Sequence, residues 1–476
     1  KFAIEKAFIE VDGSLDPYAT LKSTEISNYV EELIENRRQR YSVEEIQDAI
    51  EDKLMACKRK DVASAYIRYR YKKSLIRNHY TDLMDAVEEK LTARNVQNQN
   101  ANIDEHSFGG RQGEVTRLVT KKFALENIVS EMAQENHENN MVYIHDLDSY
   151  AAGMHNCLSI PFDDLLANGF NTRQTDVRPA NSINTAFQLL AVIFQLQSLQ
   201  QFGGVSATHL DWTMVPYVRK SFAKHFTDGL KYLYKEECDK NSFTNWSIDD
   251  PRYYDGYEEA YDYAMDMTER ELKQAVEGMY HNLNTLQSRS GNQLPFTSIN
   301  YGTCTLPEGR MIIKALLEGS IKGVGKHHKT PIFPCGIFQY GKDINGLPGT
   351  PNYDLYQLAL ESTAKRLYPN YANIDWSGNE GYDKNDPKTY FSTMGCRTAN
   401  GWDINHEEGV NGQTKDGRGN ICPVTIIMPK IAMEAKLAMD AKFADEDPLA
   451  TKEVKESWII DEFLKQLHHG WQLKLF

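Results

Sequence analysis

From residue 112 onward, helical segments alternate with short β-prone runs, and this alternation limits the architectures open to the chain. Helical spacing of apolar residues recurs at residues 116–135, 181–202, 215–234, 257–285, 308–322, 354–365 and 455–467. Short β-prone runs occupy residues 296–300, 332–338 and 424–428. Such alternation favours an α/β architecture with mostly parallel strands. Gly, Pro and Asn at the strand ends mark the loops where such folds place their chemistry.

One of these helices, at residues 181–202, is apolar around nearly its whole circumference. Asn181 or Ser182 can cap its start, and Gly203 can end it. A helix that is apolar on every side is buried, either in the core of its own domain or against another subunit. Both placements stay open. Five glutamines interrupt the stretch, which therefore falls short of the apolar length that a membrane span needs.

A smaller helical unit precedes this region. Apolar residues recur at helical steps from residue 24 to about residue 80, and Ser42 with Glu45 forms a capping box at the start of one helix. Residues 95–110 are rich in Asn and Gly, as a linker or surface loop would be. We therefore expect two domains, residues 1–94 and 95–476. On these patterns alone the first is also compatible with a plain helical docking domain.

Composition narrows the classes of function. The 476 residues carry a formal net charge of −14, which opposes binding along a nucleic-acid polymer and favours a small ligand in a local pocket. The seven cysteines form no Cys-x-x-Cys pair, and no signal peptide is visible. Dispersed, reduced thiols of this kind indicate a cytoplasmic protein without a membrane anchor.

Two glycine-hinged turns carry the residues with the clearest chemical potential. Cys396 follows Gly395 and precedes Arg397, and Asn420 ends a second turn that begins at Asp416. A thiol beside an arginine is compatible with a nucleophile or an anion site. For a lone cysteine, the more common alternative is a small buried apolar side chain.

Two further segments are candidates for a site. Residues 141–160 gather His145, His155 and Cys157 with two aspartates, which is compatible with a Cys/His nucleophile or with histidines that only hydrogen-bond. The spacing does not suit zinc, so no metal ligand is predicted. Residues 287–300 join a long helix to a strand, where backbone amides can approach a phosphate, although a structural turn explains this run equally well. No P-loop or Rossmann glycine motif is present.

Taken together, residues 98–436 resemble the catalytic domain of the class III, or anaerobic, ribonucleoside-triphosphate reductases. The runs that carry the resemblance occur in the same order, at residues 143–148, 287–300, 351–354, 365–369, 394–397, 416–418 and 428–436. The resemblance implies a ten-stranded α/β barrel with a finger loop through its centre, preceded by a small, mostly helical ATP-cone domain. Cys396 would lie at the tip of the finger loop.

The resemblance also implies a radical reaction that converts ribonucleoside triphosphates to 2′-deoxyribonucleotides. Cys396 would carry the thiyl radical, Cys157 would supply a hydrogen atom from the opposite face of the ribose, and Asn420 would orient the sugar. Formate is the expected reductant. Cys335 is assigned to the barrel wall. The predicted substrate-binding residues are His145, His155, Ser288, Gly291, Gln293 and Met394.

Regulation and radical generation follow from the same resemblance. Residues 1–94 resemble the later part of an ATP-cone, which binds ATP as activator and dATP as inhibitor. The first hairpin of such a cone, expected ahead of Lys1, is missing from this sequence. A second site for deoxynucleotide effectors is expected at the interface of a homodimer or higher oligomer, near Asp176, Ser182 and Gln188. The family keeps its glycyl radical and a four-cysteine zinc site in a carboxy-terminal region that this sequence does not contain. We therefore expect the native chain to continue past Phe476, and a separate S-adenosylmethionine-dependent iron–sulfur activase to generate the radical.

Two alternatives remain at this stage. A barrel that has lost catalysis could serve as a nucleotide-sensing protein, as the missing glycyl region suggests. Another glycyl radical enzyme of the formate-lyase type is the second alternative. That type uses two adjacent cysteines, and no two cysteines are adjacent here.

Overall fold

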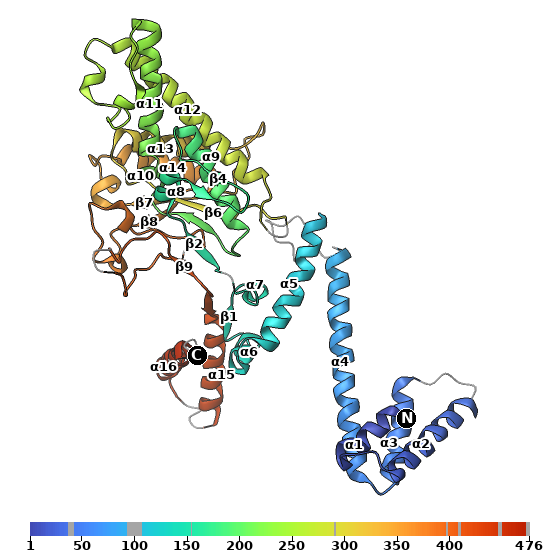
Figure 1. Ribbon diagram of the computed structural model, residues 1–476. Coiled ribbons are helices and arrows are strands. Elements are labelled where there is room, and N and C mark those ends of the chain that lie inside the picture. Colours follow the sequence, from blue (N-terminus) through green and yellow to red (C-terminus); the bar gives the residue numbers. More distant parts are fainter. Residues whose placement is uncertain are drawn as a thin grey trace. The chain divides into compact units, whose positions relative to one another are not determined.

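The computed structural model describes residues 1–36, 42–92, 107–153, 155–289, 292–396, 398–407, 411–445 and 450–472. The chain divides into two compact units, Lys1–Arg94 and Asn95–Phe476 (Figure 1). The predicted substrate residue Gly291 and the arginine at 397 lie outside the described residues.

The first unit is helical. It contains α1 (Phe2–Asp12), α2 (Pro17–Asn36), α3 (Val43–Ala56) and α4 (Lys60–Thr92). The predicted capping box is present, because the Ser42 side chain accepts from the Glu45 amide and the Glu45 carboxylate accepts from the Ser42 amide at 2.7 Å. A small core of its own stabilises this unit, built from apolar side chains that include Ile4, Phe8, Ile26, Leu54, Val62 and Tyr66.

The second unit is built on a six-stranded sheet with the strand order β8-β7-β6-β5-β2-β9. Its first five members pair in parallel: β2 (Cys157–Ser159), β5 (Val205–Ala207), β6 (Thr297–Tyr301), β7 (Cys335–Tyr340) and β8 (Asn370–Asn373). The sixth, β9 (Gly419–Asn420), runs antiparallel to β2. The predicted α/β architecture with mostly parallel strands is confirmed.

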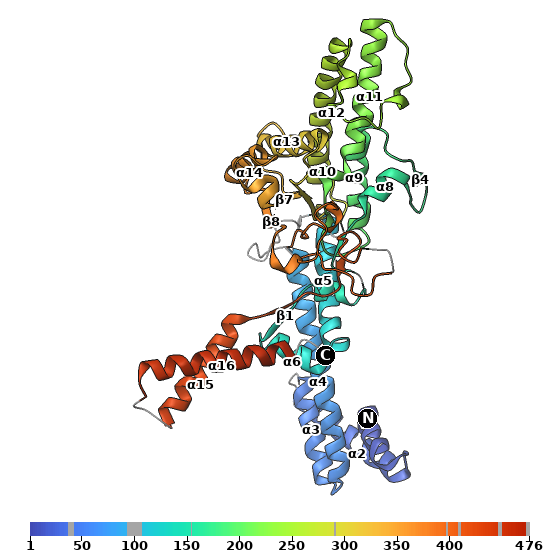
Figure 2. The same ribbon diagram turned by 90° about the vertical axis from the view of Figure 1, so that its left-hand side faces the viewer.

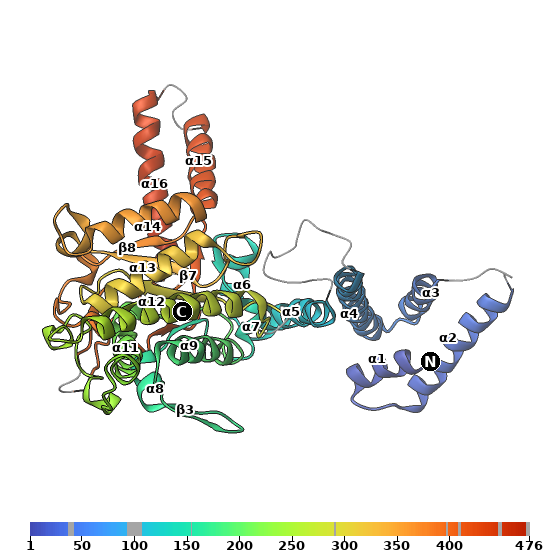
Figure 3. The same ribbon diagram turned by 90° about the horizontal axis from the view of Figure 1, so that it is seen from above.

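Two short antiparallel pairs complete the strands of the described residues. One joins β1 (Val142–Ile144) to β10 (Val424–Ile426), and the other joins β3 (Phe170–Asn171) to β4 (Asp176–Val177). Figure 3 shows the β3–β4 hairpin projecting beyond α8 (Phe162–Asn168). The β-prone run at residues 424–428 is shorter than predicted, because Met428 already begins α15.

Helices connect and cover these strands. The others are α5 (Phe108–Asn127), α6 (Glu131–Glu138), α7 (Leu147–Tyr150), α9 (Ile183–Ser198), α10 (Leu210–Thr213), α11 (Val215–Gly229) with a π-helical turn Leu230–Tyr234, α12 (Glu258–Thr285), α13 (Pro307–Lys322), α14 (Tyr353–Arg366), α15 (Met428–Asp445) and α16 (Lys452–Gln472). A second π-helical turn spans Lys342–Gly346, and short 3-10 turns lie at Lys240–Ser242, Pro251–Tyr253, Ser377–Asn379 and Pro387–Thr389. The α11 and α12 helices run side by side (Figure 2). The single helix predicted at residues 116–135 is wrong, because Ser130 caps a new helix by accepting from the Ala133 amide.

The α9 helix lies in the core of the second unit, where it packs against α12 and α11. Its buried residues are Ile183, Ala186, Phe187, Leu190, Ala191, Ile193, Phe194 and Ser198. Burial on all sides is nevertheless wrong, because Gln188 is exposed within the helix, Leu196 is 39% exposed and Leu199, just beyond its end, is 58% exposed. No helix among the described residues combines the length and apolarity that a membrane crossing demands.

Candidate active site

The predicted catalytic residues lie at the amino ends of the parallel strands. Cys157 begins β2, Gly204 directly precedes β5, and Phe296 directly precedes β6. Open parallel sheets usually bind their ligands at the opposite, carboxyl ends of the strands. A residue on a loop that starts at the carboxyl ends of the strands can therefore reach these positions only if the loop crosses one face of the sheet.

The finger loop, here the segment from residue 390 to Cys396, makes this crossing after the 3-10 turn Pro387–Thr389. Gln339 of β7 donates to the Phe391 carbonyl at 3.0 Å, and the Asn300 side chain of β6 donates to the Thr393 carbonyl at 3.0 Å. Gly395 then lies against Phe296, where an added Cβ would be only 2.8 Å from a ring carbon. A side chain at position 395 would hold the loop away from the strand, so this glycine lets Cys396 reach the amino edge.

Cys157, Cys396 and Asn420 meet at this edge. The two sulfur atoms are 3.4 Å apart, with Cys157 buried and Cys396 exposed. The Asn420 side-chain oxygen accepts from the Cys157 amide at 2.7 Å, and its amide nitrogen donates to the Thr398 hydroxyl at 3.3 Å. Thr398 also contacts the Cys396 sulfur at 3.2 Å. Three segments far apart in the sequence thus form one hydrogen-bonded cluster.

The strand pairing explains why Asn420 reaches Cys157. The antiparallel register of β2 and β9 places Cys157 directly opposite Asn420. Gly419 allows this close approach, because a Cβ at that position would lie 2.8 Å from the Cys157 carbonyl oxygen. The Asn156 amide also donates to the Asn420 carbonyl at 2.9 Å. Backbone and side chain of Asn420 are therefore both fixed by the start of β2.

Ser159 anchors the turn that leads to Asn420. Its buried hydroxyl donates to the Lys415 carbonyl at 2.7 Å and accepts from the Arg418 amide at 2.9 Å. The Gly417 amide donates to the Ser159 carbonyl at 3.1 Å. These bonds tie the glycine-rich turn to the carboxyl end of β2, and the following residues run back along that strand to the cysteines.

The pKa values of the Cys157 and Cys396 thiols are shifted in opposite directions. The hydrogen bond with Cys396, together with burial, raises the pKa of the Cys157 thiol far above its usual range. The same hydrogen bond lowers the pKa of the more exposed Cys396 thiol. The Cys157 sulfur also lies 3.0 Å from the Asn156 side-chain oxygen and accepts from the Gly204 amide at 3.2 Å. Cys157 therefore keeps its hydrogen, and Cys396 is the thiol that ionises first.

A cavity of about 260 Å³ opens onto the cysteine pair. It is lined by Arg117, Asp146, Asn156, Cys157, Phe202, Gly203, Gly204, Arg289, Gln293, Phe296 and Cys396. A larger cavity of about 560 Å³, between α5 and the end of α9, shares Arg117, Phe202 and Arg289 with it. Together they have the size and mixed polarity of a small-molecule site.

Two arginines bring positive charge to the shared wall. The guanidinium groups of Arg289 and Arg117 lie 4.8 and 5.7 Å from the centre of the Phe202 ring. Burial, with the nearby charge of Arg117, lowers the pKa of Arg289 to about 10, so that it stays charged at neutral pH. Arg117 is paired with Asp148 and Glu114, whereas the hydrogen bonds of Arg289 are to the Phe202 carbonyl and the Gln293 side chain. Arg289 can therefore receive an anion.

The five predicted substrate residues that the structure describes are dispersed. Gln293 is buried and lines the smaller cavity, and the Ser288 hydroxyl is buried without a hydrogen-bond partner. Met394 is buried within the finger loop, where its amide donates to the Thr398 carbonyl at 2.9 Å. His145 contacts the Thr425 hydroxyl at 2.7 Å across the β1–β10 pair, and His155 is exposed. Neither histidine lines the two cavities.

The proposed effector residues lie elsewhere in the second unit. Asp176 belongs to β4, Ser182 caps α9 by accepting from the Thr185 amide, and Gln188 is exposed on α9. None of the three lines either cavity. Within the described residues, no group of three or more His, Cys, Asp or Glu side chains is arranged to hold a metal ion.

Sequence reasoning missed several residues of the site, including Arg117, Phe202, Arg289 and Thr398. Arg289 and Thr398 were within reach, because they lie inside or directly after runs that were singled out. Arg117 and Phe202 had no such signal, since only the packing of α5 and α7 near the loop after α9 brings them to the cavities.

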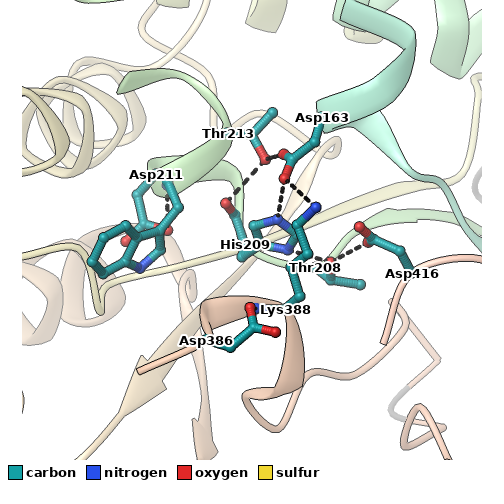
Figure 4. A network of polar contacts seen from close by, with 9 residues as sticks. Asp163, Thr208, His209, Asp211, Thr213, Asp386, Lys388 and Asp416 are labelled. Atoms are coloured by element: carbon teal, nitrogen blue, oxygen red, sulfur yellow. Dashed lines mark hydrogen bonds and ion pairs between the residues drawn. The ribbon is translucent and has the colours of Figure 1, made fainter. Parts of the chain in front are cut away.

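A buried polar network fills the carboxyl edge of the sheet, opposite the cysteines (Figure 4). Asp163 accepts from Thr213 at 2.6 Å and lies 3.1 Å from His209 and 3.2 Å from Lys388. Thr208 donates to Asp416 at 2.5 Å. The network thus joins α8 and the end of β5 to the two segments that lead to Cys396 and Asn420.

Charge pairing determines the protonation of this network. Burial alone would lower the pKa of His209, but the hydrogen bond and charge of Asp163 outweigh burial and raise it. Burial alone would raise the pKa of Asp163, but His209 lowers it strongly. The raised pKa of His209 and the lowered pKa of Asp163 favour the charged forms of both side chains, which lie 3.1 Å apart.

Comparison with known proteins shows which family the chain resembles. Residues 99–468 match the family model of the anaerobic ribonucleoside-triphosphate reductases, and residues 1–75 match that of the ATP cone domain. The anaerobic ribonucleoside-triphosphate reductase of Haemophilus influenzae is 32% identical over 437 residues, which cover 91% of this chain and 56% of the relative. The protein of the same name from Escherichia coli is 30% identical, over 86% of this chain and 53% of the relative. The chain thus spans about half the length of these curated relatives.

Solved structures support the fold. The anaerobic ribonucleotide reductase of Thermotoga maritima, crystallised with dATP in its specificity site, matches with a TM-score of 0.50. The match has 15% sequence identity and covers 85% of this chain and 60% of the other. Together with the sheet and the finger loop, this likeness confirms the α/β barrel architecture expected from the sequence, and the sheet of the described residues has six strands where the resemblance implied ten.

Proposed function

Because the chain belongs to the anaerobic ribonucleoside-triphosphate reductase family, we propose that its second unit carries out the reduction of ribonucleoside triphosphates to 2′-deoxyribonucleoside triphosphates. The observation that carries this proposal is the convergence of Cys157, Cys396 and Asn420 beside a cavity with an available arginine. A thiol that stays protonated next to one that is exposed suits hydrogen-atom transfer in both directions.

Each residue has a distinct part in the proposed reaction. A radical stored on a glycine outside the described chain would take the hydrogen atom of the Cys396 thiol. The Cys396 sulfur then removes the 3′-hydrogen of the ribose, after which the 2′-hydroxyl leaves as water. Cys157, whose raised pKa keeps it protonated, donates a hydrogen atom to the sugar. Asn420 and Thr398 hydrogen-bond the reacting sugar and hold the two loops in register.

The overall balance needs a two-electron reductant. Formate, which loses its hydrogen and two electrons on becoming carbon dioxide, is the reductant that we propose. It suits a site in which Cys157 is the one thiol in contact with Cys396 among the described residues. After each turnover the 3′-hydrogen returns to the sugar, so that the Cys396 radical is regenerated.

The triphosphate needs positive charge and hydrogen-bond donors. We assign this role to Arg289 and Arg117, together with Gln293 and the free Ser288 hydroxyl. Charge-assisted bonds from arginine to phosphate are strong and geometrically selective. Roles for His145, His155, Gly291 and Met394 remain predictions that rest on the family motif.

Regulation is proposed for the first unit and for the surface near α9. Residues 1–94 would bind ATP and dATP, and Asp176, Ser182 and Gln188 would take part in binding deoxynucleotide effectors at a subunit interface. The proposed assembly is a homodimer or higher oligomer in the cytoplasm, activated by an S-adenosylmethionine-dependent iron–sulfur enzyme. A zinc site is proposed only for a carboxy-terminal glycyl radical region of the kind that the family resemblance implies.

An anaerobic turnover assay tests the proposal. The protein is incubated with its activase, S-adenosylmethionine, formate and radiolabelled CTP, and the formation of dCTP is followed. Cys396→Ser should abolish dCTP formation while the affinity for CTP stays nearly unchanged, because only the hydrogen-abstracting atom is lost. Cys238→Ser, at an exposed cysteine far from the site, is the matched control. Turnover by Cys396→Ser at the control rate would refute the assignment.

A further inference from the structure

The two site cysteines contact each other directly. Their sulfur atoms are 3.4 Å apart, although 239 positions separate them in the sequence. Among the described residues, this is the one pair of cysteine side chains for which a sulfur–sulfur contact is observed. The finger loop and the start of β2 hold the two thiols in this arrangement through Gly395 and Asn420.

A ribose ring does not fit between sulfur atoms at this distance. Non-bonded carbon atoms pack at about 3.5–4.0 Å, and sulfur needs at least as much on each side of the ring. Cysteines that act on opposite faces of one sugar must therefore lie about 7 Å or more apart. The contact between Cys157 and Cys396 thus belongs to the protein without substrate, and nucleotide binding has to separate them.

We propose that Cys157 and Cys396 form a reversible disulfide in the substrate-free protein. An oxidant of the diamide or disulfide class accepts two electrons and two protons while the two S–H bonds break and one S–S bond forms. A dithiol reductant reverses the step. The sulfur atoms need to approach by about 1.4 Å to reach the usual bond length of about 2.04 Å.

The environments of the two thiols suit the two halves of this reaction. Cys396 is exposed and is the more acidic thiol, so it reacts first with an oxidant. Cys157 is buried and in contact, so its sulfur attacks the oxidised Cys396 sulfur while its proton passes to the leaving group, which departs reduced.

Three other described cysteines have different surroundings. Cys335 contacts the Tyr368 hydroxyl, Cys304 is buried beside Gly309, and Cys238 is exposed. Oxidation of an isolated exposed thiol proceeds instead toward sulfinic and sulfonic acids, which are essentially irreversible. The disulfide would therefore protect Cys396 from irreversible oxidation and would also close the site to ribose. This consequence rests on the proposed function, whereas the disulfide itself rests on the contact.

Peptide mapping tests the proposal. The reduced protein is treated with a small excess of diamide, alkylated, digested without reductant and analysed by mass spectrometry. We expect a cross-linked pair of peptides that contain Cys157 and Cys396, lighter by two hydrogen atoms and separable by dithiothreitol. The cross-link should disappear in Cys157→Ser and Cys396→Ser and persist in Cys238→Ser. Oxidation of Cys396 to sulfinic acid without a cross-link, or cross-linking of Cys396 to another cysteine, would overturn the proposal.

Added CTP separates this proposal from the proposed function. If both hold, saturating CTP slows formation of the cross-link at least tenfold, because the sugar keeps the sulfur atoms apart. A cross-link that forms equally fast with CTP supports the disulfide and contradicts ribose binding between the cysteines. Absence of the cross-link without CTP, in a protein that binds CTP, contradicts the disulfide alone.

Discussion

The side chain of Asn420 joins both cysteine segments, so its removal has a calculable effect on stability. Its oxygen accepts from the Cys157 amide at 2.7 Å, and its nitrogen donates to the Thr398 hydroxyl at 3.3 Å. Cys157 is only 2% exposed, so water has little access to its amide. In Asn420→Ala this buried donor loses its partner.

The magnitude follows from the two bonds. A buried donor left without an acceptor costs about 1–3 kcal/mol, and a long neutral hydrogen bond such as that to Thr398 contributes about 0.5 kcal/mol. The backbone bond from Asn156 to the Asn420 carbonyl is retained and limits the loss. We expect Asn420→Ala to lower the free energy of unfolding of the second unit by about 1.5–3 kcal/mol.

Urea unfolding followed by tryptophan fluorescence measures this change. Ile421→Ala is the matched control, because the neighbouring side chain is 75% exposed and its truncation should alter stability by no more than about 0.5 kcal/mol. Equal unfolding midpoints for Asn420→Ala and Ile421→Ala would show that the amide does not hold Cys157. In that case the Asn420 side chain does not position the cysteines.

Three further predictions concern the finger loop, the arginine and the buried ion pair. Gly395→Ala should lower the free energy of unfolding in urea by about 1–3 kcal/mol, because its Cβ would lie 2.8 Å from the Phe296 ring. Gly401→Ala, at a glycine with open space around it, should leave the free energy of unfolding unchanged. Equal stabilities of the two variants would contradict the close approach of Gly395 to Phe296. Arg289→Gln should weaken CTP binding about 10- to 100-fold by calorimetry, in line with the loss of a charged hydrogen bond. Arg270→Gln, at a 70% exposed side chain on α12, should bind CTP normally. Unchanged affinity in Arg289→Gln would exclude Arg289 from the triphosphate site. The pKa of His209 is raised in the folded protein, so its pairing with Asp163 stabilises fully below the unfolded value of about 6.5 and is lost as pH rises through the folded pKa. The free energy of unfolding should therefore fall as pH rises above about 6.5, and this dependence should be absent from His209→Gln; parallel pH profiles for the two proteins would refute the ion pair.

Much of the second unit was predictable because its helices and strands have clear local patterns. The long α12 helix and the buried β6 strand lie close to their predicted bounds. The errors come from local competition. Ser130 caps a new helix and interrupts an otherwise continuous apolar pattern, and Met428 starts a helix directly after a short strand. The spacing of apolar residues alone predicts neither of these two helix boundaries.

The site shows a different limit of sequence reasoning. The motifs named Cys157, Cys396 and Asn420, but their contact depends on a strand register and on a loop that crosses the sheet. The 3.4 Å sulfur contact, the Thr398 bridge and the shared arginine wall arise only from this tertiary packing. The sequence thus predicted the candidate residues, but it could not predict the direct contact between the two cysteine sulfur atoms.

The most direct test of the central claim is whether a ribonucleotide occupies the space at the cysteine pair. The rate of alkylation of Cys396 by iodoacetamide is measured by mass spectrometry with and without saturating CTP, with exposed Cys238 as internal reference. We predict that CTP slows alkylation of Cys396 at least tenfold and leaves Cys238 unaffected. An unchanged rate at Cys396, under conditions where CTP is bound, would contradict a ribonucleotide site at these cysteines.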